Sequence, residues 1–341
     1  MNSRKTTLIL AFLWGWTAAI AQPVEYRRPR TFSLERADSL HYPRLWVGAG
    51  VAAVGYPTGM SMLWNSWYAK YPFQRFHFFN DMQEWQQMDK LGHVYSAYQE
   101  TRLGYHLGYW AGMKPKSAIW TGIALGQLVQ TSFEIFDGFS SEWGFSLGDI
   151  GANVTGSALF AIQQHTWREQ RITLKMSTKI PRYPDVLVYP SQGNGPPVSL
   201  QDRADALYGT GLASLLLKNY NAQAMWVSVN PRSFAQTATW LPRWLNVSVG
   251  MGADNMFSGF GYTWQPDKSC TGPDCLVYAV DPVQFPRTRQ WFLSLDVDLA
   301  RIPVKNRTLK TVLATLNMFK IPAPTLEWSR QRGINAYWMY F

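Results

Sequence analysis

The sequence predicts an α+β protein: an N-terminal bundle of about four helices rich in Gly and Ala, followed by an antiparallel β-rich module that either rests on the bundle or is membrane-associated. Two long stretches of the first half, 117–133 and 150–167, contain no Asp, Glu, Lys or Arg, as is typical of tightly packed helices. Beyond residue 170, apolar and polar residues alternate in several short runs, which is the pattern of antiparallel strands.

The first 21 residues have the three parts of a secretory signal peptide. Arg4 and Lys5 form a short basic region, the run 8–20 is apolar, and the small residues Ala19 and Ala21 precede the expected cleavage point. The apolar run is too short to span a bilayer, although an uncleaved anchor is the alternative. Because no Cys follows this run, a lipid anchor is not expected at the usual place. We therefore predict an exported chain.

The charge and aromatic content of the chain indicate which kinds of partner to expect. The formal charge is +10 at pH 7, and in an exported protein this excess is expected to meet anionic lipid rather than nucleic acid. Aromatic residues make up 15% of the chain, and Trp and Tyr are favoured at membrane interfaces. The mean hydropathy of −0.19 is too polar for a protein made mostly of membrane helices. Basic and aromatic residues are not interleaved in a nucleic-acid-binding module, so we expect no nucleic acid partner.

An extended leader, rich in Arg and broken by prolines, is predicted over 22–42. The stretch Leu45–Ala69 that follows contains no charged residue, and it is long enough to cross a bilayer. A buried helix pair hinged at Pro57 is the alternative. Both interpretations make this stretch the first part of the bundle.

Three further helices are expected, over about 80–113, 116–136 and 146–170, which places the bundle at 43–170. Asp81 and Glu84 have the spacing of a capping box at the start of the first of them. Ser146 and Asp149 repeat this spacing at the start of the last.

The C-terminal half is predicted to consist of a Pro/Gly-rich linker over 171–204 and a β-rich module over 205–341. Strands are expected at the alternating runs 225–229, 245–251, 259–264, 291–299 and 335–341, with one helix at 308–319. The terminal Phe341 on an aromatic strand is typical of outer-membrane β-proteins. The module is expected to lean on the membrane or on the bundle, and a module that spans the membrane is the alternative.

Cys270 and Cys275 are the only cysteines, and a Gly-Pro-Asp turn lies between them. In an exported protein they are expected to form a loop-closing disulfide. No His is near enough for a zinc site.

Polar residues at helical spacing are the candidate functional residues. The first predicted helix carries Asp89, Lys90 and His93, the second Glu134 and Asp137, and the third Asp149, Asn153 and Gly156. A His and several carboxylates that converge inside a bundle can bind a divalent metal or provide a general base, with His93, Asp89 and Glu134 as the catalytic candidates. The alternative is a buried polar network that fixes the packing of the helices, since Asp149 is already explained as the capping partner of Ser146.

This ordered set resembles the YfiM-like family of predicted periplasmic lipoproteins, a family of unknown function. Its motifs read Asp89-Lys90-x-x-His93, Glu134-x-x-Asp137 and Asp149-x-x-x-Asn153-x-x-Gly156. The resemblance covers about residues 86–165, the long C-terminal half is similar to that of Bacteroidetes-type members, and the first motif is similar to one in VanZ-like membrane proteins. It implies a place in the periplasm or outer membrane of a Gram-negative bacterium, and it implies no reaction.

We therefore expect a non-enzymatic envelope protein with a structural or binding role at the outer membrane, and with membrane lipid or envelope proteins as its partners. One alternative is a metal-assisted hydrolase acting on lipid or cell-wall material. The other is a subunit of an envelope transport or assembly complex.

Overall fold

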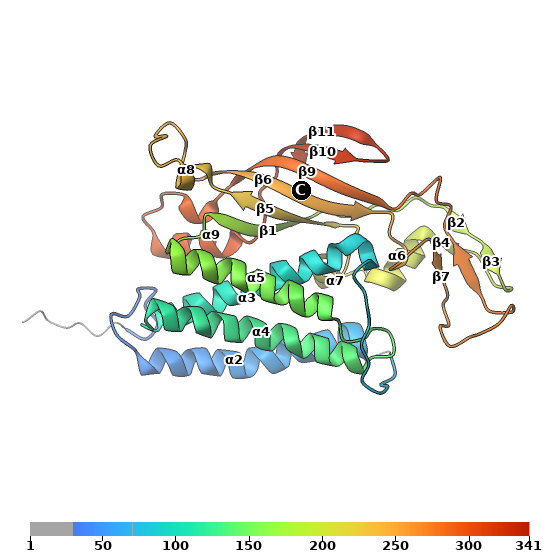
Figure 1. The fold of residues 1–341 in the computed structure, drawn as a ribbon, viewed down its shortest axis with the longest axis horizontal. Coiled ribbons are helices and arrows are strands. Elements are labelled where there is room, and N and C mark those ends of the chain that lie inside the picture. The colour runs from blue at the N-terminus through green and yellow to red at the C-terminus, as the bar shows by residue number, and fades with distance from the viewer. Residues whose placement is uncertain (1–29, 70, 341) are drawn as a thin grey trace, which may run out of the picture.

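A computed structural model describes residues 30–69 and 71–340 of the chain (Figure 1). Helices form the N-terminal half and a large antiparallel sheet forms the C-terminal part, which confirms the predicted α+β class. The predicted signal peptide over 1–21 and the leader up to residue 29 lie outside the described residues.

The bundle consists of four long helices: α2 (Tyr42–Leu63), α3 (Met88–Trp110), α4 (Pro115–Phe139) and α5 (Leu147–Thr166). Helix α3 packs against both α4 and α5, while α2 lies along the outer side of the bundle (Figure 1). Helix α5 begins as predicted, because Ser146 Oγ accepts a hydrogen bond from the backbone N–H of Asp149 at 3.1 Å.

Both interpretations of Leu45–Ala69 were wrong. Helix α2 runs without a break through Pro57 and continues in a π-helical turn, Trp64–Tyr68. It is not a buried pair, since Arg44 is the one buried residue among its described side chains and Val54 is 69% exposed. Across the described ranges, no helix has both the length and the apolar character needed to cross a membrane. Leu45–Ala69 lacks charged residues because it forms an apolar helix on the surface of the bundle, and its four glycines lower the mean hydropathy of that helix.

Helix α3 begins at Met88, six residues later than the capping box of Asp81 and Glu84 predicts. A 3-10 turn, Glu84–Gln87, precedes it, and Trp85 to Gln87 have φ angles of 49°, 54° and 66°, which interrupt a right-handed helix. Asp81 does not cap the helix with Glu84, because its carboxylate accepts a hydrogen bond from Ser146 at 2.6 Å instead. Tertiary polar contacts therefore decide where this helix starts.

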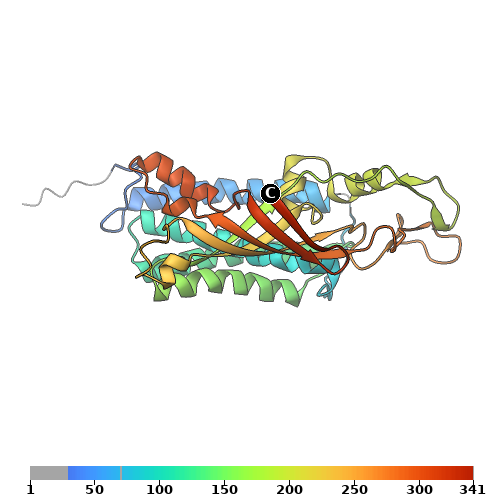
Figure 2. The same cartoon turned by 90° about the horizontal axis from the view of Figure 1, so that it is seen from above.

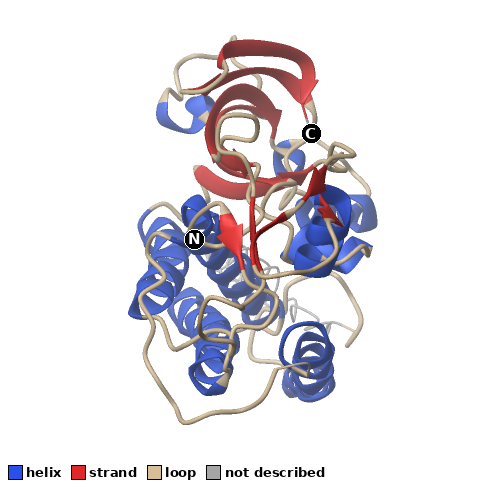
Figure 3. Cartoon of the chain, turned by 90° about the vertical axis from the view of Figure 1, so that its right-hand side faces the viewer, coloured by secondary structure: helices blue, strands red, loops and turns tan. Residues whose placement is uncertain are grey.

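The main sheet has six antiparallel strands in the order β1-β5-β6-β9-β10-β11. Their bounds are β1 (Ile172–Thr178), β5 (Gln223–Val229), β6 (Leu245–Asp254), β9 (Thr288–Val297), β10 (Ala323–Ser329) and β11 (Gly333–Tyr340). Four of them match predicted runs, whereas β1 lies in the segment predicted as a linker and β10 was not predicted. Seen from the end, the sheet curls strongly above the helices (Figure 3).

Shorter elements form an extension at one end of the molecule (Figure 2). It contains β2 (Leu187–Val188), β3 (Pro190–Gln192), β4 (Val198–Ser199), β7 (Thr263–Trp264), β8 (Val277–Ala279) and α6 (Leu200–Tyr208). Cys270 and Cys275 form a disulfide in its β7–β8 loop. The remaining elements are α7 (Leu212–Leu217), α8 (Pro231–Phe234), a 3-10 turn (Leu299–Arg301) and α9 (Arg307–Leu316), the last of which overlaps the helix predicted at 308–319.

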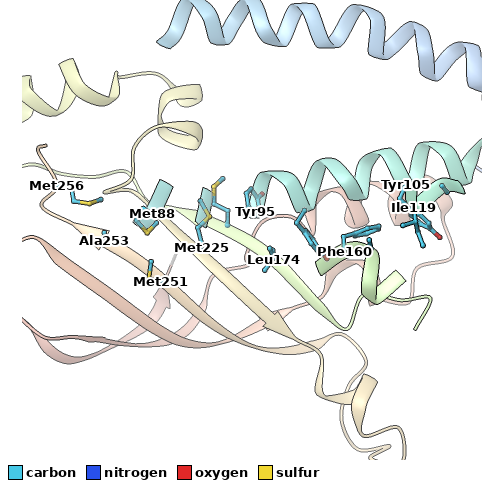
Figure 4. Close-up of a cluster of buried hydrophobic side chains, with 14 residues drawn as sticks. Met88, Tyr95, Tyr105, Ile119, Phe160, Leu174, Met225, Met251, Ala253 and Met256 are labelled. Atoms are coloured by element: carbon cyan, nitrogen blue, oxygen red, sulfur yellow. The ribbon is translucent and has the colours of Figure 1, made fainter. Parts of the chain in front are cut away.

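The largest core cluster joins the bundle to the sheet. Met88, Tyr95 and Phe160 from the helices pack with Leu174 and Met225 from the first two strands (Figure 4). Because α3 contributes to this core and to the helix contacts on its other side, it holds the two halves of the protein together.

Candidate functional site

The polar residues predicted on three helices meet in one place, where α3, α4 and α5 approach each other. The members of this polar cluster are Asp81, Glu84, Asp89, Lys90, His93, Glu134, Asp137, Asp149 and Asn153. Gly156 is not among them, because it lies one turn further along α5, where its backbone packs against Val94 of α3.

Lys90 lies between three carboxylates. Its Nζ is 2.8 Å from Asp81, 3.0 Å from Asp89 and 2.7 Å from Asp149, and the side chain is 11% exposed. Burial on its own lowers the pKa of Lys90, but the charges of Asp89 and Asp149 outweigh it, so the pKa lies above its ordinary value. Lys90 is therefore a fixed positive charge at neutral pH.

His93 lies on the other side of the same carboxylates. Its Nδ1 donates to Asn153 Oδ1 at 3.0 Å, and its Nε2 is 3.9 Å from Asp89 and 3.7 Å from Asp149. Burial lowers the pKa of His93, whereas the charges of Asp89 and Asp149 raise it, and the balance is about 9.

The carboxylates of the cluster differ in how firmly they hold a proton. Burial raises the pKa of Glu134 and of Glu84 to about 8, and that of Asp137 to about 7. Burial also raises the pKa of Asp149, together with the charge of Asp89. For Asp89, burial is outweighed by His93, Lys90 and a hydrogen bond from Tyr220, so its pKa lies below the ordinary value. Perturbed pKa values of this kind concentrate at functional sites.

Two tyrosines complete the cluster, and neither could be found from the spacing of the helical motifs. Tyr220, in the loop before β5, donates to Asp89 Oδ1 at 2.6 Å. Tyr68, in the π-helical turn after α2, donates to Asp137 Oδ1 at 2.8 Å. They come from segments far away in the sequence, so the cluster connects the bundle to the C-terminal half.

A comparison with known protein families finds a match over the helical segment that holds the polar cluster. Residues 77–165 match the family of predicted periplasmic lipoproteins DUF2279. The DUF2279 segment is less than half of the chain, and it contains every residue of the polar cluster except the two tyrosines. Its description confirms the predicted location: the protein is exported, to the periplasm or the outer membrane. No curated protein and no solved structure matches the chain.

Outside the DUF2279 segment, the sheet exposes apolar side chains. Val227, Val249, Leu293 and Leu326 lie directly across from one another on successive strands, and each is 44% to 51% exposed. With their neighbours they form a surface that we call the apolar sheet face, which consists of Val227, Val247, Val249, Trp291, Leu293, Leu295, Leu326, Trp328 and Ile334.

The opposite face of the same strands is buried, and it carries several polar side chains beside Trp226 and Phe292. Ser228, Ser248 and Ser294 lie across from one another there and are at most 4% exposed. Lys175 Nζ lies 2.7 Å from Asp296 Oδ2, with both side chains 0% exposed. A sheet with one face in water normally buries its apolar side. Here the side that carries Val249 and Leu293 is exposed over parts of β5, β6, β9 and β10, although Met225 and Met251 on the same side are buried against the bundle.

Glu100 on α3 is a buried carboxyl group whose effect on stability can be measured. Its Oε1 accepts from Gln130 Nε2 at 2.9 Å, and burial raises its pKa to about 8, against the opposing effects of Gln130 and His93. The folded state therefore keeps a proton that the unfolded state loses, and the stability it contributes disappears as pH rises from about 4.5 to about 8.

Replacing Glu100 by Gln is expected to remove this loss. The variant should match the wild type near pH 4.5 and exceed its free energy of unfolding by about 1–3 kcal/mol at pH 8. Urea unfolding at the two pH values measures the difference between the two proteins. Parallel pH profiles of wild type and variant would show that Glu100 is ionised in the folded protein.

Proposed function

We propose that this protein is a binding protein of the bacterial envelope that attaches to the outer membrane through the apolar sheet face. The observation that supports the proposal is the exposure of this face: its nine apolar side chains are 38% to 75% exposed, while Ser294 and Asp296 on the other side of β9 are buried. A contiguous apolar surface of this kind is unfavourable in water, and it usually marks an interaction site.

Lipid is the partner that fits the surroundings of this face. Trp291 and Trp328 lie side by side on it, and Trp is favoured where an apolar environment meets a wet one. Exposed arginines stand at its two ends, Arg330 in the β10–β11 turn and Arg243 just before β6. With the formal charge of +10, this arrangement suits a membrane surface that contains anionic lipid.

Vesicle flotation tests the proposal. The double variant Leu293→Glu, Leu326→Glu is expected to bind phosphatidylethanolamine–phosphatidylglycerol vesicles at least tenfold more weakly, because each leucine contributes about 1.5–3 kcal/mol when it is taken out of water. Leu187→Glu is the matched control, since Leu187 is 51% exposed but lies on β2, away from the face, and should bind like the wild type. Equal binding by the double variant and the wild type would exclude this face as the attachment surface.

The polar cluster supports a second candidate, a metal-assisted hydrolase with His93 as the base and Asp89, Glu134, Asp137 and Asp149 as ligands or orienting groups. The third candidate function is that of a subunit of an envelope complex, which would use the apolar sheet face to bind protein.

A stable partner that copurifies in detergent with the wild type, but not with the Leu293→Glu, Leu326→Glu variant, would favour this third candidate over membrane attachment. We also propose that the chain is related to YfiM-like proteins of the Bacteroidetes type, and more weakly to VanZ-like proteins. This proposal rests on the three motifs.

A further inference from the structure

We propose that the polar cluster binds one divalent cation between His93, Asp89 and Asp149. The ligand atoms would be His93 Nε2 and a carboxylate oxygen from each aspartate, and these three lie within 4.8 Å of one another. The site goes beyond membrane attachment and does not depend on the apolar sheet face. It makes His93 a ligand, in place of the base of the hydrolase candidate.

The hydrogen bonding of His93 orients the ring so that Nε2, whose proton the cation would replace, faces the two aspartates. Asn153 Oδ1 can only accept, so the 3.0 Å contact places a proton on Nδ1. The other ring nitrogen, Nε2, then points to Asp89 and Asp149 at 3.9 and 3.7 Å. A histidine whose second nitrogen donates to a fixed oxygen is the usual arrangement at metal sites, because it sets both the tautomer and the ring orientation.

Two buried polar atoms beside these residues are left without hydrogen bonds by the described part of the chain. Glu134 Oε1 is one of them, on a side chain that is 0% exposed, and it lies 3.7 Å from His93 Nδ1. The other is Asn153 Nδ2. An unpaired buried polar atom is costly, and a hydrated cation in the cluster would supply water to Glu134.

The cluster also holds more carboxyl groups than basic side chains, and a bound cation would favour their ionised forms. Six carboxylates belong to the cluster, on Asp81, Glu84, Asp89, Glu134, Asp137 and Asp149, against the side chains of Lys90 and His93. Lys90 already lies 2.7 Å from Asp149 Oδ1, so the cation would share this oxygen with an ammonium group. One imidazole and two carboxylates suit a first-row ion such as Zn²⁺ or Mn²⁺ better than Ca²⁺, which prefers oxygen ligands.

The test is metal binding by the full chain in detergent after dialysis against a chelator. Elemental analysis and calorimetric titration with Zn²⁺ and Mn²⁺ are expected to give one ion per chain, with at least 100-fold weaker binding in His93→Gln and in Asp149→Asn. His165→Gln is the matched control and should bind like the wild type, because His165 is an exposed residue near the other end of α5.

Two results would overturn the proposal: no stoichiometric ion in the wild type, or equal binding by the wild type and both site variants. A titration with Co²⁺ keeps the test independent of whether the variants fold. The wild type alone should develop the visible absorption bands of a mixed nitrogen and oxygen ligand set, and a spectrum unchanged from that of free Co²⁺ would count against the site.

Discussion

Replacement of Lys90 by Met is expected to lower the free energy of unfolding by about 3–5 kcal/mol. The ammonium group lies within 3.0 Å of Asp81, Asp89 and Asp149, and the side chain is 11% exposed. Without it, three carboxylates remain together in a buried site, where their repulsion is poorly screened and each must be protonated or unpaired. Urea unfolding at pH 7 measures the loss.

A surface ion pair is the matched control for this variant. Lys268 Nζ lies 2.6 Å from Glu142, but the lysine side chain is 64% exposed. Lys268→Met is expected to change the free energy of unfolding by less than about 1 kcal/mol, because exposed pairs are screened by water. If the two variants lose similar amounts, the cluster is hydrated rather than buried. Partial recovery of the Lys90→Met variant by Zn²⁺ would further support the cation site, since the ion would replace the missing charge.

The sequence allowed the polar cluster to be predicted because its main residues recur at helical spacing. Asp89 and His93 share a face of α3, and the capping of α5 by Ser146 places Asp149 at the same end of the bundle. Local rules are sufficient for such features, since the contacts involve residues a few positions apart.

Features that depend on distant contacts could not be predicted in this way. Tyr220 reaches Asp89 across 131 positions of the chain, and no local pattern indicates it. The predicted start of α3 was wrong for the same reason. Asp81 accepts a hydrogen bond from Ser146, 65 positions away, and does not cap its own helix. Lack of charge in Leu45–Ala69 was also ambiguous, since it fits an exposed apolar helix as well as a buried or spanning one.

The strands show a different limit. Alternation identifies β9 correctly, and β1 has the same pattern in Ile172, Leu174 and Met176, so it was available in the sequence and was obscured by the prolines that follow. Alternation does not reveal which face is covered. In β9 the buried positions include Ser294 and Asp296, because the strand curls around a polar interior that contains Lys175.

Replacement of Gly156 by Ala is expected to cost about 3 kcal/mol or more. A Cβ atom at this position would lie 2.1 Å from the carbonyl oxygen of Val94, which belongs to the backbone of α3 and cannot rotate away. The two helices would therefore have to move apart. This motion would disturb the polar cluster, because Asp89, His93, Asp149 and Asn153 lie on the same pair of helices one to two turns away.

The same helix provides a control of opposite sign. Gly151 is also on α5, but no atom lies within 4 Å of a Cβ placed there, so Gly151→Ala should raise the free energy of unfolding by about 0.5–1 kcal/mol through helix propensity alone. Thermal or urea unfolding of both variants distinguishes the effect of close contact between α3 and α5 from the effect of helix propensity. If Gly156→Ala also stabilised the protein, α3 and α5 would not be in contact at this point, and the distances from His93 to Asp149 and Asn153 would lose their structural basis.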